Sequence, residues 1–161
     1  MTLVIARPNG VATVDRLVPS DVDALLAMYE RCSPDTTYRR WHGHLRSFPT
    51  AYLSALLAGA DQHIAVVARR DSRVIGFASA AETVPGTREI GILVEDRWQR
   101  RGVGRRLQSI LLTESVALGT QYVRAEVLAS DAWLVDALRV LGPTSVRTES
   151  GIMTAEVQLW A

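Results

Sequence analysis

The order of apolar and polar positions along the chain predicts a succession of strands and helices. Short apolar runs rich in β-branched residues are typical of buried strands, and they occupy residues 11–18, 63–68, 73–80, 89–94, 122–128, 145–149 and 152–159. Apolar residues that recur every three or four positions predict helices starting near residues 20, 34, 52, 103 and 131. Residues 1–9 show neither pattern. This order indicates an α+β or α/β fold with a mixed sheet.

Residue types that favour helix termini mark the start of several of these helices. Ser20, followed three residues later by Asp23, is an N-cap pattern before the first helix. Pro34 suits the first position of the second helix, which is expected to run on to Leu45. Asp131 is well suited to cap the helix that ends before residue 142.

The stretch from residue 89 to residue 118 reads as a buried strand, a turn and an amphipathic helix. The turn contains Gly102 and Gly104, and the apolar face of the helix begins at Val103. A helix N-terminus presents unpaired N–H groups and the positive end of the helix dipole, which together favour a phosphate. Glycine has no Cβ to hold such a ligand away from the backbone. The pattern therefore predicts a site for a ligand that carries phosphate.

Composition limits the kind of ligand. The 161 residues fit a single domain over residues 1–161, and the formal net charge is +1. The chain has no lysine, and five of its 18 arginines lie close together, at positions 97, 100, 101, 105 and 106. This charge is confined to one turn, and Trp98 is the only aromatic residue within it. The pattern therefore favours a small anionic ligand over nucleic acid.

Other residue types exclude several alternatives. The one cysteine, Cys32, cannot form an internal disulfide, and its position in an apolar helix face predicts a structural role. His42, His44 and His63 have no metal-ligand spacing, so no metal is expected. No apolar run is long enough to span a membrane, and the N-terminus lacks a signal-like pattern, so we expect a cytoplasmic protein.

The turn sequence resembles a known coenzyme A loop. Residues 99–104 read Gln-Arg-Arg-Gly-Val-Gly, which is neither a dinucleotide fingerprint nor a Walker A loop. They are similar to the pattern Gln/Arg-x-x-Gly-x-Gly/Ala of the GNAT superfamily of N-acetyltransferases. Residues 33–41 also resemble the Ser-Pro-x-Ser-x-Tyr-x-Arg-Phe segment of bacterial protein acetyltransferases in that superfamily. The order of elements follows the superfamily over nearly the whole chain.

The resemblance implies a fold, a donor and a set of binding residues. It implies the α/β/α layers of the GNAT fold, with a mixed, mostly antiparallel sheet of about seven strands and about four to five helices. The implied acyl donor is acetyl-CoA, lying in a gap where two strands separate. The residues implied to bind it are Leu93 and Val94 at the thioester end, and Gln99, Arg100, Arg101, Gly102, Val103, Gly104 and Arg105 at the pyrophosphate.

The resemblance also implies a catalytic base. The family pattern Ala-Glu-x-Ala-x-x-Val, here residues 88–94, puts a base at Glu89, although a strand-end glutamate can also be structural. Glu82 is a second candidate, by cross-strand pairing. The family often has asparagine and tyrosine on its fourth helix, but these positions hold Asp131 and Leu138. The usual proton donor for the leaving thiolate is therefore missing.

Two functions follow from these observations. The first is direct transfer of an acetyl group from acetyl-CoA to a primary amine, which could be a protein lysine, a protein N-terminus or a small amine. The second, motivated by the missing tyrosine, is a catalytically silent acyl-CoA-binding sensor or regulatory module. The resemblance also allows a homodimer. We expect neither nucleic acid nor a membrane as a partner.

Overall fold

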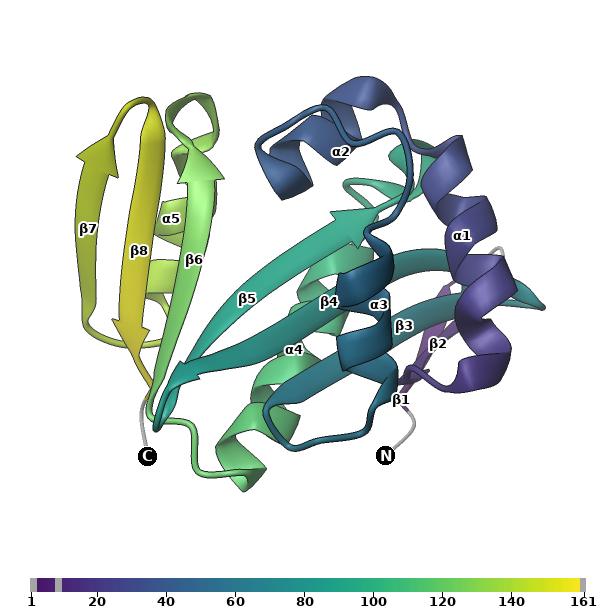
Figure 1. The fold of residues 1–161 in the computed structure, drawn as a ribbon, viewed down its shortest axis with the longest axis horizontal. Coiled ribbons are helices and arrows are strands. Elements are labelled where there is room, and N and C mark those ends of the chain that lie inside the picture. The colour runs from purple at the N-terminus through teal and green to yellow at the C-terminus, as the bar shows by residue number, and fades with distance from the viewer. Residues whose placement is uncertain (1–2, 8–9, 160–161) are drawn as a thin grey trace.

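The structure is a computed structural model that describes residues 3–7 and 10–159, so the ends of the predicted 1–161 domain lie outside the described residues. Its sheet has eight strands in the order β1-β2-β3-β4-β5-β6-β8-β7 (Figure 1). The strands are β1 Leu3–Arg7, β2 Gly10–Arg16, β3 His63–Arg70, β4 Arg73–Val84, β5 Thr87–Val94, β6 Tyr122–Leu128, β7 Thr144–Glu149 and β8 Ile152–Gln158. Neighbouring strands are antiparallel except β5 and β6, which are parallel.

Helices cover both faces of the sheet (Figure 1). The helices α1 Val22–Arg31, α2 Pro34–Trp41 and α3 Thr50–Leu57 lie on one face, and α4 Val103–Ala117 and α5 Trp133–Arg139 lie on the other. Short 3-10 helices occupy Pro19–Asp21, Asp96–Trp98 and Ala129–Asp131. The layers are therefore helix, sheet and helix, as the resemblance implies.

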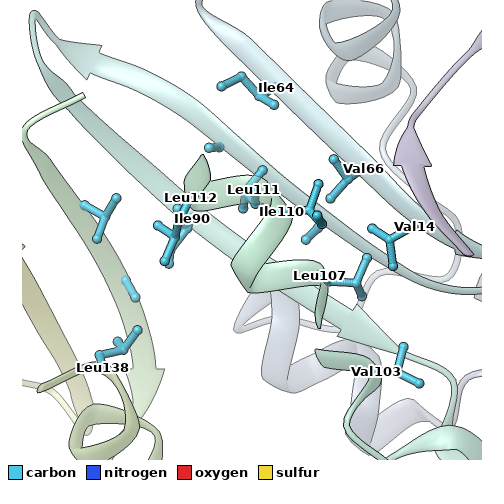
Figure 2. Packing of buried hydrophobic residues seen from close by; sticks show 14 of the residues in the cluster. Val14, Ile64, Val66, Ile90, Val103, Leu107, Ile110, Leu111, Leu112 and Leu138 are labelled. Atoms are coloured by element: carbon cyan, nitrogen blue, oxygen red, sulfur yellow. The ribbon is translucent and has the colours of Figure 1, made fainter. Parts of the chain in front are cut away.

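Two hydrophobic clusters hold the layers together. On the α4 side, Leu107 and Leu111 are fully buried against β3 and β4, and Leu138 of α5 belongs to the same cluster (Figure 2). On the other side, Leu25 and Met28 of α1 are fully buried against residues of β3, β4 and β5. Val103, the first residue of α4, is buried in this cluster, and it therefore anchors the end of the turn that precedes the helix.

The sheet opens between β5 and β6. Only three residue pairs join these strands, and the last of them is Glu89 with Arg124. Beyond that pair the two strands diverge, so that β6, β8 and β7 stand apart from the rest of the sheet (Figure 1). The resulting gap, which we call the β5–β6 gap, is the strand separation that the resemblance implies.

Most of the predicted elements are present, and the predicted fold class is confirmed. The sheet has one strand more than the seven predicted from the sequence, because β1 occupies Leu3–Arg7 in the stretch where no element was expected. The second helix was predicted to reach Leu45, but it ends at Trp41. His42 then takes the left-handed conformation, with φ of 53°, which breaks the helix.

Two predicted helix caps are wrong. Ser20 lies inside a 3-10 helix, and it is the carboxylate of Asp21 that accepts the N–H of Val18, at 2.9 Å. Asp131 also lies in a 3-10 helix, and α5 begins after Ala132 without a side-chain cap. In both places a 3-10 turn precedes the α-helix, so the capping residue read from the sequence is not at the helix boundary.

Candidate active site

The turn between β5 and α4 contains two residues in the left-handed region. Arg100 has φ of 58°, and Gly102 has φ of 85° and is the N-cap of α4. Glycine adopts this region without the steric cost that a Cβ brings. The turn therefore brings the chain from the end of β5 directly onto the N-terminus of α4.

The N-terminus of α4 has no side-chain cap. Its first hydrogen bond runs from the N–H of Arg106 to the carbonyl of Gly102, at 3.2 Å, so the N–H groups of Val103, Gly104 and Arg105 precede the regular ladder. The first turn has no acidic residue. These amides and the helix dipole are therefore available to an anion.

Hydrogen bonds to the start of α2 hold the turn in place. Gln99 Nε2 donates to the carbonyl of Val94 at 3.0 Å and to the hydroxyl of Thr36 at 3.1 Å. The carboxylate of Asp96 accepts the N–H of Ser33 at 2.8 Å and the hydroxyl of Thr36 at 3.1 Å. Burial alone would raise the pKa of Asp96, but these hydrogen bonds outweigh it, and the pKa is lowered overall. The side chain predicted to bind coenzyme A, that of Gln99, thus has a structural role.

A buried ion pair fixes the end of β5 to α1. Glu95 is 4% exposed, and its carboxylate lies 3.0 Å from Nη2 of Arg31. The same nitrogen donates to the carbonyl of Val74 on β4, at 2.9 Å. Three elements therefore meet just before the turn.

The arginines of the turn differ in their surroundings. Arg100 and Arg105 are exposed and form no ion pair within the described part of the chain. The guanidinium of Arg101 lies 5.4 Å from the ring centroid of Trp98, and that of Arg70 lies 4.8 Å from the same centroid. Arg100 and Arg105 are therefore the freer of the predicted phosphate ligands.

Two predicted binding side chains belong to the core. Leu93 is 2% exposed and packs with the α1 cluster, and Val103 is 6% exposed and packs with the α4 cluster. Their backbone atoms, and not these buried side chains, are what a ligand can reach. Val94 is partly buried, and a Cβ on Gly104 would lie 3.7 Å from its Cγ2.

Glu89 lies where the β5–β6 gap begins. It is exposed, it pairs with Ala81 on β4, and it forms the last residue pair with Arg124 on β6. Its carboxylate makes no ion pair or hydrogen bond within residues 12–159. Glu82 faces Arg88 instead, with its carboxylate 3.5 Å from Nη2, on the opposite side of the sheet from Glu89. The two candidate carboxylates therefore lie on opposite faces of the sheet, and Glu82 is the one with a cationic partner.

Helix α2 lies at the open end of the gap (Figure 1). Nε of Arg39 on α2 lies 3.7 Å from the carboxylate of Asp131. Nδ1 of His42, directly after α2, lies 3.9 Å from the carboxylate of Glu126 on β6. These pairs connect the two sides of the sheet across the gap.

Between them along α2, Arg40 points to the other edge of the gap. A Cβ on Gly91 of β5 would lie 2.4 Å from the Cζ atom of Arg40. Sequence reasoning did not single out Arg40, although the resemblance of residues 33–41 to a family segment was a signal for this helix.

Comparisons with known proteins agree with this arrangement. A sequence profile described as the acetyltransferase (GNAT) family matches residues 16–142. The chain belongs to the GNAT family. No curated protein matches the chain in sequence.

Solved structures of GNAT proteins have the same fold. The GNAT domain of PAT from S. lividans is 20% identical, with a TM-score of 0.85 over 98% of this chain and 97% of that one. The putative acetyltransferase yncA from Salmonella typhimurium, solved with acetyl-CoA, is 20% identical, with a TM-score of 0.69 over 92% and 94% of the two chains. The ribosomal-protein-S18-alanine N-acetyltransferase from Escherichia coli is 19% identical, with a TM-score of 0.68 over 93% and 95%.

Acetyl-CoA is the acyl donor of this family, and the described residues fit it. The uncapped amides of α4, with Arg100 and Arg105 beside them, suit a pyrophosphate. The β5–β6 gap leads from those amides toward Glu89. The described residues of this GNAT domain include no cluster of three His, Cys, Asp or Glu side chains able to hold a metal ion. They also include no helix long and apolar enough to span a membrane.

Two family positions have a changed role in this GNAT domain. Leu138, at the position where the family often has tyrosine, is 6% exposed and lies in the α4 cluster, so it offers no proton donor. Asp131 is 7% exposed and faces Arg39. Cys32 does not replace the missing donor, because burial, with smaller contributions from Asp96 and Glu95, raises the pKa of its thiol to about 12.

Proposed function

We propose that this GNAT domain transfers an acetyl group from acetyl-CoA directly to a primary amine. The observation that supports it most is the position of Glu89 at the start of the β5–β6 gap, with the uncapped N-terminus of α4 at the other end of β5. A donor bound along that gap would have its pyrophosphate at α4 and its reactive end near an unpaired carboxylate.

Donor binding, deprotonation of the amine and stabilisation of the carbonyl oxygen then each have a group in the chain. The backbone amides of Val103, Gly104 and Arg105 bind the pyrophosphate, assisted by Arg100. Acetyl-CoA supplies an acyl group that is already activated as a thioester. The carboxylate of Glu89 takes the proton of the amine, which is mostly protonated near neutral pH because an ordinary lysine has a pKa of about 10.4. A backbone N–H near Val94 is our proposed partner for the carbonyl oxygen.

The missing tyrosine does not prevent this reaction. A thiolate with a pKa near that of cysteine, about 8.5, leaves readily without a proton donor. We further propose that water protonates it, that the protein acts in the cytoplasm and that residues 1–161 form one domain. Size-exclusion chromatography with light scattering decides between a monomer and the homodimer that the resemblance allows.

The test is the rate of coenzyme A release by the parent and by Glu89→Gln in single-turnover experiments. The glutamine keeps the size of the side chain but cannot accept the proton, so the rate at neutral pH should fall about a hundredfold to ten-thousandfold. Acetyl-CoA affinity, measured by calorimetry, should stay unchanged. The defect should shrink as the pH rises toward the pKa of the amine, because the acceptor then arrives neutral.

Glu149→Gln is the matched control, since Glu149 is exposed at the end of β7. Parental rates for Glu89→Gln would show that Glu89 is structural. If the parent binds acetyl-CoA but releases no coenzyme A with any amine, the protein is the silent binding module instead.

A further inference from the structure

Arg40 lies near the proposed base, and its guanidinium has no anionic partner among residues 12–159. Its Nη2 donates to the hydroxyl of Tyr52 at 3.0 Å and to that of Ser79 at 3.4 Å, and both groups are neutral. Its Nε is buried and makes no hydrogen bond. Its Nη1 also has no partner in this part of the chain but is not sealed from solvent. The guanidinium therefore has donors to spare on a side that a ligand can reach.

The surroundings of Arg40 hold the guanidinium in one place. Its Cζ lies 4.1 Å from the ring centroid of Trp41 and 5.7 Å from that of Tyr52. Aromatic faces stabilise a cation but satisfy none of its N–H groups. A partly buried charge without a counter-ion is costly, so its position calls for an explanation beyond packing.

The sequence of β5 makes room for this side chain. A Cβ on residue 91 would lie 2.4 Å from Cζ and 2.6 Å from Nε of Arg40, so only glycine permits the observed position. The family pattern has alanine there. Gly91 is two residues from Glu89 on the same face of the strand, so the Cα atoms of the two residues are about 7 Å apart. The unpaired cation and the unpaired carboxylate therefore belong to neighbouring positions on the α2 side of β5.

We propose that Arg40 binds the carboxylate of the acceptor, and that the acceptor is a small α-amino acid whose amine is acetylated. This inference rests on the proposed function. The two N–H groups of Nη1 are unpaired, and the positive charge of the guanidinium makes a hydrogen bond from them to a carboxylate a strong one. Neighbouring positions on one face of a strand have Cα atoms about 7 Å apart, so an acceptor that meets both side chains needs its amine and its carboxylate close together, on a short spacer. An α-amino acid has its amine and its carboxylate on one carbon and fits that spacer, whereas the side-chain amine of lysine is four methylenes away from its backbone.

The experiment compares each amino acid with its own carboxamide. Glycine, alanine and phenylalanine are assayed by coenzyme A release beside glycinamide, alaninamide and phenylalaninamide, with a lysine peptide and a peptide with N-terminal alanine as competing classes. The amide has the less basic amine, so a preference for the acid runs against intrinsic reactivity. We expect kcat/KM for at least one acid to exceed that for its amide at least tenfold.

Three variants tie that preference to Arg40. Arg40→Gln should reduce the acid-to-amide ratio to about one, and Arg40→Lys should restore part of it, because the ammonium keeps the positive charge but not the planar geometry of the guanidinium. Gly91→Ala keeps the arginine but displaces its guanidinium, so the ratio should fall as in Arg40→Gln. Arg139→Gln, at an exposed arginine of α5, is the control and should keep the parental ratio. A merely structural arginine would change the rates for acid and amide together and leave the ratio intact.

The outcomes separate this inference from the proposed function. Equal rates for acids and amides, faster turnover of either peptide, or an unchanged ratio in Arg40→Gln would overturn the role of Arg40 while leaving acetyl transfer intact. Failure to bind acetyl-CoA would overturn the proposed function. If acetyl-CoA binds but no amine reacts, calorimetric titration of alanine and alaninamide into the coenzyme A complex decides the question. Tighter binding of alanine that Arg40→Gln abolishes would support the role of Arg40, and equal binding would refute it.

Discussion

Replacing Arg31 with methionine should destabilise the protein at the point where β5 enters the coenzyme A turn. The guanidinium of Arg31 is the cation for Glu95, which is 4% exposed, at a distance of 3.0 Å. It also donates to the carbonyl of Val74, at 2.9 Å. Methionine replaces the aliphatic stem of arginine but leaves a buried carboxylate and a carbonyl without their donor.

The size of the effect follows from the burial of the pair. Removing one partner of a buried pair costs about 3–5 kcal/mol, because the remaining charge stays desolvated. The Arg31 side chain is 27% exposed, so water reaches part of the pair and the lower end of that range applies, about 3 kcal/mol. With a urea m-value of about 2 kcal/mol per molar, the unfolding midpoint should fall by about 1.5 M.

Urea unfolding followed by circular dichroism measures this directly. The double variant Arg31→Met with Glu95→Gln removes the uncompensated charge, so it should regain more than half of the lost free energy of unfolding. Arg139→Met is the control, because its pair with Asp136 is exposed and should contribute less than about 0.5 kcal/mol. The reasoning fails if Arg31→Met unfolds within 0.5 M urea of the parent, or if the double variant is less stable than the single one.

Two further predictions concern the turn and the cysteine. Gly104→Glu should weaken acetyl-CoA binding at least about tenfold in calorimetry, because it brings a negative charge to the helix N-terminus. Gly104→Ala should have a smaller effect, since a Cβ at that position makes only an ordinary 3.7 Å contact with Val94. Equal binding by the folded Glu variant would contradict the phosphate site. Because burial raises the pKa of Cys32 to about 12, its alkylation by iodoacetamide in the native protein should be slow at pH 7, and the rate should still be rising at pH 10. In the denatured protein the alkylation rate should level off above about pH 9. A plateau near pH 9 in the native protein would contradict this.

The parts of the site that the sequence predicts are those built from consecutive residues. The strand, the left-handed glycine and the apolar face beginning at Val103 all lie within one stretch, and their spacing alone indicates a helix N-terminus pointing out of a sheet. Local periodicity also predicts every helix and all strands but one. The exception is β1, whose residues 3–7 gain their order from pairing with β2 rather than from a pattern of their own.

The parts that the sequence does not predict depend on register and on distant contacts. Glu82 and Glu89 are both near strand ends, and only the pairing of Glu82 with Arg88 shows that the two carboxylates face opposite sides. Asp131 reads as a helix cap because its burial against Arg39, 92 positions earlier, leaves no trace in the local sequence. Leu93 was expected to line the thioester end, but a buried residue and a gap-lining residue have the same apolar character, and Leu93 is 2% exposed.

The two positions where β5 departs from the family pattern explain each other through the geometry of the strand. Arg88, in place of alanine, is 1% exposed and donates to Thr120 and to the carbonyls of Asp61 and Gln62, so its face of β5 is anchored. The next residue, Glu89, must then point to the other face. On that face Gly91, again in place of alanine, admits the guanidinium of Arg40. One substitution thus fixes the direction of the proposed base, and the other places a free cation beside it, where an acceptor with both an amine and a carboxylate would meet both groups at once.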